Sequence, residues 1–95
     1  MPRITRSILA RADLRGIWLY IAQESVDAAD RFLDRLDQTI RLIAESPEIG
    51  EPQDQIKPGL RRFVVAQYLV FCETTATGIR VVRVLHGARR WEEEL

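Results

Sequence analysis

The chain is poor in the residues from which enzymes build metal and nucleophile sites. Its 95 residues include one histidine, His86, one cysteine, Cys72, and one lysine, Lys57. A single cysteine forms neither a disulfide nor a cysteine-based zinc site within one chain, and its apolar neighbours predict a small buried side chain. The sequence also has no glycine-rich phosphate loop and no Gly-x-Ser-x-Gly motif. We therefore expect no metal and no cofactor.

Long hydrophobic runs and net charge are absent too. No stretch reaches the ~18 apolar residues of a membrane span, and the first residues lack the apolar region of a signal peptide. We therefore expect a cytoplasmic protein with no membrane partner. The formal net charge is zero, so we expect no direct sequence-specific binding of nucleic acid by this chain alone. The length predicts one domain spanning residues 1–95.

Positive charge is concentrated in the C-terminal half. Seven cations lie between Lys57 and Arg90, against one acid, Glu73, in the same stretch. Six of the seven are arginines, whose planar forks suit carboxylates or phosphates. This distribution predicts a basic patch, although an overall preference for arginine would explain the same composition.

The first half predicts two helices joined by a short turn. Ser7 can cap a helix over residues 8–24, and Ser25 can cap a second that runs to about Glu45. Packing on a sheet would bury one face of this helical hairpin, made of Leu14, Ile17, Trp18, Ile21, Ala29, Phe32, Leu36 and Ile40. A second apolar stripe on the first helix, Ile8, Ala12 and Leu19, would then stay exposed. Such a stripe on a small domain indicates an interface.

Four strands are predicted, at residues 3–6, 60–66, 68–74 and 79–86, with a loop over 48–59. The order β-α-α-β-β-β predicts an α+β fold with the helical hairpin on one face of a small, mainly antiparallel sheet. Strict alternation along the last strand divides its residues between two faces. One face would carry Arg80, Val82, Val84 and His86, and the other Ile79, Val81, Arg83 and Leu85.

The last strand ends in His-Gly-Ala-Arg-Arg-Trp, which places ionisable groups at one rim of the sheet. His86 could act in acid-base chemistry or serve as a strand-end histidine bonded to the backbone. Trp91 could anchor a partner or cover the edge of the core. The sequence leaves both pairs of alternatives open.

Six blocks, in this order and spacing, resemble the ParE-type toxins of the RelE/ParE superfamily, across nearly the whole chain. They are DLxxIWxYIA at 13–22, AAxRF at 28–32, PxxG at 47–50, PGLR at 58–61, YLVF at 68–71 and VLHGAR at 84–89. The resemblance implies the same α+β fold and the toxin role in a bacterial type II toxin–antitoxin pair. It also implies inhibition of DNA gyrase by binding rather than catalysis, and neutralisation by a ParD-like antitoxin in a hetero-oligomer.

On this resemblance we expect two contact surfaces. The target-binding surface would comprise Arg61, Arg62, Tyr68, His86, Arg89, Arg90 and Trp91. The antitoxin-binding surface would comprise Ile8, Ala12, Leu19, Arg83 and Arg89, with an amphipathic antitoxin helix along the apolar stripe and an extended acidic segment after it.

The alternative is a ribosome-dependent mRNA endonuclease of the RelE branch. Its catalytic residues would be Arg61, Arg83, His86 and Arg89. Members of that branch carry an arginine before a Leu-Val-Tyr block, where this chain has Tyr68, and they tend to be strongly basic, as binding of phosphates requires. A histidine in some of these nucleases falls near His86, which keeps the alternative open.

Overall fold

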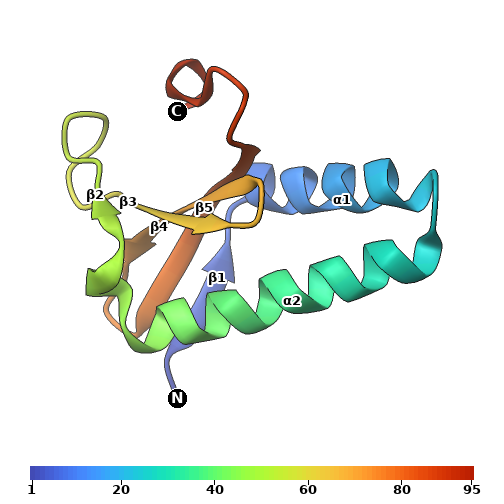
Figure 1. Ribbon diagram of the computed structural model, residues 1–95. Coiled ribbons are helices and arrows are strands. Elements are labelled where there is room, and N and C mark those ends of the chain that lie inside the picture. Colours follow the sequence, from blue (N-terminus) through green and yellow to red (C-terminus); the bar gives the residue numbers. More distant parts are fainter.

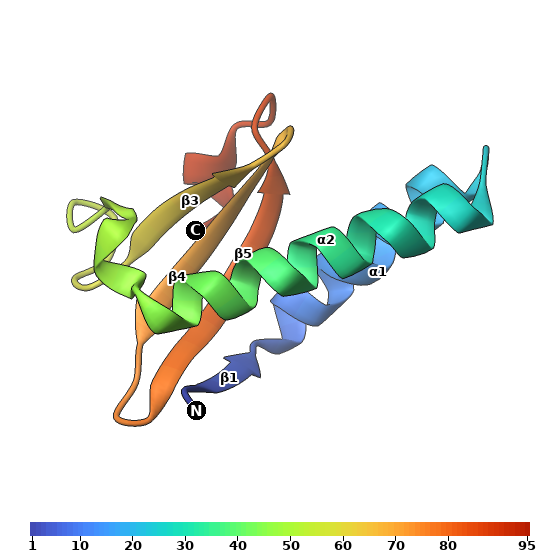
Figure 2. The ribbon, with the colours of Figure 1, turned by 60° about the horizontal axis from the view of Figure 1, so that its bottom comes forward.

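The computed structural model describes residues 1–95, in which two helices lie on one face of a five-stranded sheet (Figures 1 and 2). The strands are β1 (Arg3–Arg6), β2 (Glu51–Pro52), β3 (Arg61–Val65), β4 (Tyr68–Thr74) and β5 (Gly78–His86). The helices are α1 (Ile8–Ala22) and α2 (Val26–Glu45), with short 3₁₀ turns at Pro47–Ile49 and Trp91–Glu94. The strand order is β1-β5-β4-β3-β2, with β1 parallel to β5 and every other neighbour antiparallel. The predicted α+β fold is confirmed.

Serine side chains begin both helices, as predicted. Ser7 Oγ accepts a hydrogen bond from the backbone N–H of Ala10 (2.9 Å), and Ser25 Oγ accepts one from Ala28 (3.1 Å). The α1 helix ends at Ala22, two residues earlier than predicted. The helices lie side by side and extend past the edge of the sheet (Figure 2). Neither combines the length and apolarity needed to cross a bilayer.

Apolar side chains form a cluster on each face of the sheet. The larger cluster lies under the helices, where Leu36 and Ile40 of α2 pack with β-strand residues such as Val70 and Val81. Of the helix residues predicted to be buried, Ile17, Ala29, Leu36 and Ile40 are buried, whereas Leu14, Trp18, Ile21 and Phe32 are only partly buried. The smaller cluster, on the far face, comprises Leu60, Leu69, Phe71 and Leu85, covered in part by Ile56, Val82 and Trp91.

Cys72 lies in the larger cluster, as predicted for a small buried side chain. It is 2% exposed, and burial raises the pKa of its thiol to about 12. The thiol therefore stays protonated at neutral pH, and its role is packing.

A β-bulge in β5 makes the predicted alternation of this strand wrong from Arg83 onward. Val81 pairs with Cys72 and Arg83 pairs with Phe71, which leaves Val82 as an extra residue. One inserted residue reverses the facing of everything after it. Val84 and His86 therefore face the helices together with Val81, while Val82 contacts the far-face cluster. The predicted loop over 48–59 also contains β2, which pairs with the start of β3.

Candidate functional site

An apolar surface on α1 faces away from the sheet. Ile8 and Leu19 are 85% and 55% exposed, and Ala12 between them is also exposed. These three residues, here called the α1 stripe, are as exposed as the sequence predicts. The stripe offers a partner an apolar surface on a rigid helix.

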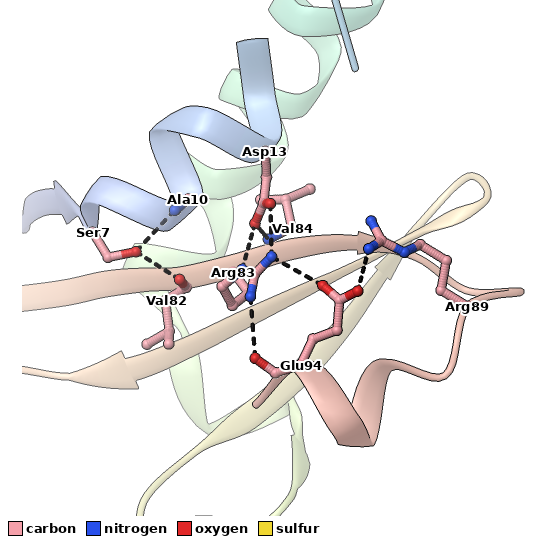
Figure 3. Close-up of polar contacts among 8 residues, drawn as sticks. All are labelled: Ser7, Ala10, Asp13, Val82, Arg83, Val84, Arg89 and Glu94. Atoms are coloured by element: carbon pink, nitrogen blue, oxygen red, sulfur yellow. Dashed lines mark hydrogen bonds and ion pairs between the residues drawn. The ribbon is translucent and has the colours of Figure 1, made fainter. Parts of the chain in front are cut away.

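A partly buried ion-pair network ties α1, β5 and the C-terminal turn together (Figure 3). The Arg83 guanidinium donates from Nε and Nη2 to both carboxylate oxygens of Asp13 (2.8 and 2.9 Å). It also donates to the carbonyl oxygen and to the carboxylate of Glu94 (3.1 Å each). The Arg83 and Asp13 side chains are 12% and 11% exposed. Four of the five guanidinium N–H groups are thus engaged inside the chain.

The same carboxylate fixes the backbone of the strand. Asp13 Oδ2 also accepts a hydrogen bond from the N–H of Val84 (2.9 Å). The hydrogen bond from Arg83 to Asp13 is the main cause that raises the pKa of the guanidinium, against the lowering effect of burial. Arg83 is therefore a cation held in one place, with four of its five N–H groups already bonded within the chain.

Most other cations of the sheet half are also bound locally, by carboxylates or by carbonyl oxygens. Arg61 donates to the carbonyl oxygens of Glu48 (3.0 Å) and Gly50 (2.7 Å). The ion pairs are Lys57 with Glu73 (2.9 Å), Arg62 with Glu51, Arg89 with Glu94 and Arg90 with Glu93 (3.6 Å). Of the seven cations in this half, Arg80 alone makes no ion pair or side-chain hydrogen bond. The predicted basic patch is therefore offset by acids close to it.

A cleft of about 440 Å³ lies between α1 and the end of β5. Its walls are Ala12, Asp13, Gly16, Ile17, Tyr20, Tyr68, Val84, His86 and Arg89. We call it the α1–β5 cleft. It brings together three of the residues predicted for target binding, Tyr68, His86 and Arg89, and one residue of the α1 stripe, Ala12.

His86 is positioned by the turn that follows it. Its Nδ1 accepts a hydrogen bond from the backbone N–H of Ala88 (3.1 Å), and its ring meets Tyr68 edge-on at 5.3 Å between centroids. The interpretation as a strand-end histidine bonded to the backbone is confirmed. An accepting Nδ1 carries no proton, so the neutral ring keeps its proton on Nε2 as a donor.

Trp91 covers the far-face cluster at the opposite side of the sheet. Its ring lies 5.3 Å from that of Phe71, and the Arg62 guanidinium stacks over it at 5.3 Å. Trp91 therefore covers the edge of the core, which is one of the two roles predicted for it from the sequence. Arg62 and Trp91 therefore lie on the other face of the sheet from His86.

Of the four residues predicted for an RNA-cleaving site, the structure brings only His86 and Arg89 into one cleft. Arg83 is enclosed by the ion-pair network. Arg61 lies four residues further along the sheet than the Tyr68–His86 pair, roughly 13 Å at strand spacing. The four side chains do not converge.

The model of a protein family, the ParE toxin of the type II toxin–antitoxin system parDE, matches residues 4–91. The chain belongs to the ParE toxin family. Toxin ParE1 of Caulobacter vibrioides is 36% identical over 78 residues, which cover 81% of this chain and 80% of that toxin. Toxin ParE1 of Mycobacterium tuberculosis is 37% identical over 86 residues and 88% of each chain. A solved structure described as the chromosomal ParDE TA system from P. aeruginosa has the same fold, with a TM-score of 0.74 over 90% of this chain and 96% of that one, at 15% identity.

Two residues that shape the site of this ParE-family chain, Asp13 and Glu94, were not predicted from its sequence. Asp13 and Glu94 bind Arg83, and Gly16 forms part of the cleft wall. The run of three glutamates after Arg89, Arg90 and Trp91 was the available signal for Glu94. No local signal pairs Asp13 with a residue seventy positions away.

Proposed function

We propose that this chain is a cytoplasmic toxin that inhibits DNA gyrase by binding it, and that a ParD-like antitoxin neutralises it in a hetero-oligomer. Membership of the ParE family supports the toxin role. The observation that favours binding over catalysis is the enclosure of Arg83 by Asp13 and Glu94. A phosphate-cleaving site needs free, convergent charge on the reacting group, and the charged groups here are paired with one another.

The proposed target surface is the C-terminal rim of the sheet. Arg89 and Arg90 are its exposed cations, and Tyr68 and His86 form the wall beneath them. Arg62 and Trp91 would contribute from the far face, and Arg61 from the helix-covered face further along the sheet. A surface of arginine and aromatic side chains is typical of interface hot spots.

The proposed antitoxin surface is the α1 stripe of Ile8, Ala12 and Leu19, covered by an amphipathic helix. Arg89, with a half-exposed side chain, is the accessible basic contact. Arg83 would join only if Glu94 released it, because both carboxylate partners now enclose it.

Induced expression in bacteria tests the gyrase proposal. We expect induction of the DNA-damage response and filamentation, and co-expression of the antitoxin should prevent both. Growth arrest with unchanged plasmid supercoiling would contradict the proposal, because inhibition of gyrase must relax the DNA.

Ribosome-dependent mRNA cleavage remains the second candidate, because His86 and Arg89 line the same cleft. Primer extension on mRNA in a translating extract separates the two functions. We expect no new 5′ ends after addition of the chain. If cuts appeared and His86→Gln slowed them by ~10²–10⁴-fold, the usual size of a general acid-base contribution, the nuclease function would replace the gyrase proposal.

A further inference from the structure

A second groove lies beside β3, two strands away from β5 in the sheet. Its volume is about 440 Å³, and its walls come from the last turns of α2, from residues 49–51 and from residues 62–64. We call it the α2–β3 groove. Three large apolar side chains, Leu42, Ile49 and Val64, line it, and each is more exposed than Leu19 of the α1 stripe. The chain therefore has a second exposed apolar surface.

The edge of β3 beside this groove has one residue whose backbone groups are unpaired. The carbonyl oxygen of Leu60 accepts a hydrogen bond from the N–H of Gln53 (2.8 Å), so it points toward β2. Because backbone groups alternate in direction along a strand, the N–H and C=O of Arg62 and Val64 point the same way. The β2 strand pairs with β3 only over residues 61–62. No strand therefore lies opposite Val64 on this side.

The chain that precedes β2 leaves this position open. A Cβ on Gly50 would lie 2.5 Å from the ring of Phe63, so only glycine allows the backbone to pass this close. Phe63 belongs to the cluster under the helices. From Gly50 the chain therefore runs toward α2 and not along β3. The backbone of Val64 stays available to another strand.

The open stretch of edge is short, which limits what strand addition can offer. The β2 strand occupies the position beside Arg62, and the turn at Ala66, with a φ of 54°, ends β3 on the other side. A long peptide would gain only the two hydrogen bonds of Val64. A second copy of this chain gains the same two, because two Val64 residues opposite each other across a two-fold axis exchange both bonds. The second copy also brings a second apolar surface.

The charges of the groove also suit a second copy. Its charged lining residues are Glu51 and Arg62, and they form an ion pair with each other. One charge of each sign gives no preference for an acidic or a basic partner. Across a two-fold axis the same two charges recur, so two copies meet without net repulsion.

We propose that two copies of this chain associate through the α2–β3 groove, with their β3 strands antiparallel about Val64 and with Leu42 and Ile49 packed against the other copy. Phe63 and Val65 face the helices, so the Val64 side chain lies on the opposite face of the sheet. The dimer would therefore bury apolar side chains on both faces of the joined sheet. The inference goes beyond the proposed function and does not depend on it, and the α1 stripe lies on the other helix, outside this interface.

Sedimentation velocity of the full chain, without antitoxin, tests the association from micromolar to millimolar concentration. We expect a reversible equilibrium of monomer and dimer, with a dissociation constant of roughly 10 μM to 1 mM, as for a small interface. NMR then locates the contact. The amide signal of Val64 should shift with chain concentration, and its hydrogen should exchange more slowly in the dimer.

Two valine substitutions give the matched comparison. Val64→Lys should weaken association by about 100-fold or more, because two lysines would meet across the axis and two apolar contacts would be lost. Val26→Lys is the control, since Val26 is also exposed but lies at the other end of α2, and it should leave the dissociation constant unchanged. If Val64→Lys does not fold, Ile49→Lys replaces it, because Ile49 lies outside the strands.

The proposal is overturned if the chain stays monomeric at millimolar concentration, or if Val64→Lys associates as strongly as Val26→Lys. It is also overturned if an apolar pentapeptide such as acetylated Val-Thr-Val-Thr-Val shifts the Val64 amide of a chain that remains monomeric, since the groove would then be a peptide site. Supercoiling assays test the gyrase proposal separately, so failure of either leaves the other standing.

Discussion

Asp13 connects the first helix to the last strand through one carboxylate. It accepts hydrogen bonds from the side chain of Arg83 and from the backbone of Val84. An ion pair this enclosed adds little net stability compared with apolar side chains, but removing one partner leaves a buried charge without compensation. The pair therefore fixes where α1 lies on β5, and with it the width of the cleft.

Asp13→Asn keeps the size of this side chain and removes its charge. We expect the free energy of unfolding to fall by about 3 kcal/mol, near the lower end for a broken buried pair, because Glu94 still contacts Arg83. Urea denaturation measures it. Asp37→Asn is the control, since Asp37 also pairs with two arginines but is 38% exposed, and it should cost no more than ~1 kcal/mol. Equal losses in the two variants would refute the role given to Asp13.

At the scale of elements, β1 is held by a contact that only glycine permits. A Cβ on Gly78 would lie 1.9 Å from the backbone oxygen of Arg3 and 2.5 Å from its nitrogen. Backbone atoms cannot rotate away as a side chain does, so the parallel pairing of β1 with β5 depends on this residue. That pairing places Ser7, and therefore the start of α1.

Two Gly→Ala substitutions separate this contact from helix propensity. Gly78→Ala should lower the free energy of unfolding by about 1–3 kcal/mol, the usual cost of overpacking. Gly16→Ala, where the new Cβ meets nothing, should raise it by up to about 1 kcal/mol. Thermal denaturation of both variants shows whether each substitution raises or lowers the free energy of unfolding. If Gly78→Ala left the free energy of unfolding unchanged, β1 could shift without loss of stability, and the role given to Gly78 would be wrong.

The exposed α1 stripe leads to a prediction about antitoxin binding. Leu19→Glu should weaken antitoxin binding by about 2–3 kcal/mol, because a buried leucine contact is replaced by a desolvated charge. Leu42→Glu is the matched control: Leu42 is similarly exposed, at 65%, but lies on α2 outside the stripe. Titration calorimetry compares the two. If Leu42→Glu had the larger effect, the antitoxin would bind the opposite side of the hairpin.

Local patterns in the sequence predicted both helices, their serine caps, four of the five strands and the exposed stripe. Each of these depends on neighbours within a few residues. The bulge at Val82 and the two-residue β2 depend on pairing between distant strands, and alternation alone could not reveal them. The same is true of the cleft, because the bulge is what turns His86 toward α1, and the partners of Arg83 come from both ends of the chain.

At the scale of the whole molecule, zero net charge reflects equal numbers of basic and acidic residues, 14 of each. The basic side chains of the sheet half are bound by nearby carboxylates or carbonyl oxygens, Arg80 excepted. A molecule of this kind is suited to recognition of a protein partner by shape and a few exposed anchors. It is poorly suited to gripping and cleaving a polyanion.

The central claim is that the chain inhibits gyrase by binding to it and not by catalysing a reaction. A titration of gyrase supercoiling against the molar ratio of chain to gyrase, after a short and a long incubation, tests it most directly. We predict that inhibition follows the molar ratio, saturates, and is the same at both times. Full supercoiling at a large excess of folded chain, or progressive inhibition by substoichiometric amounts as incubation lengthens, would contradict the claim.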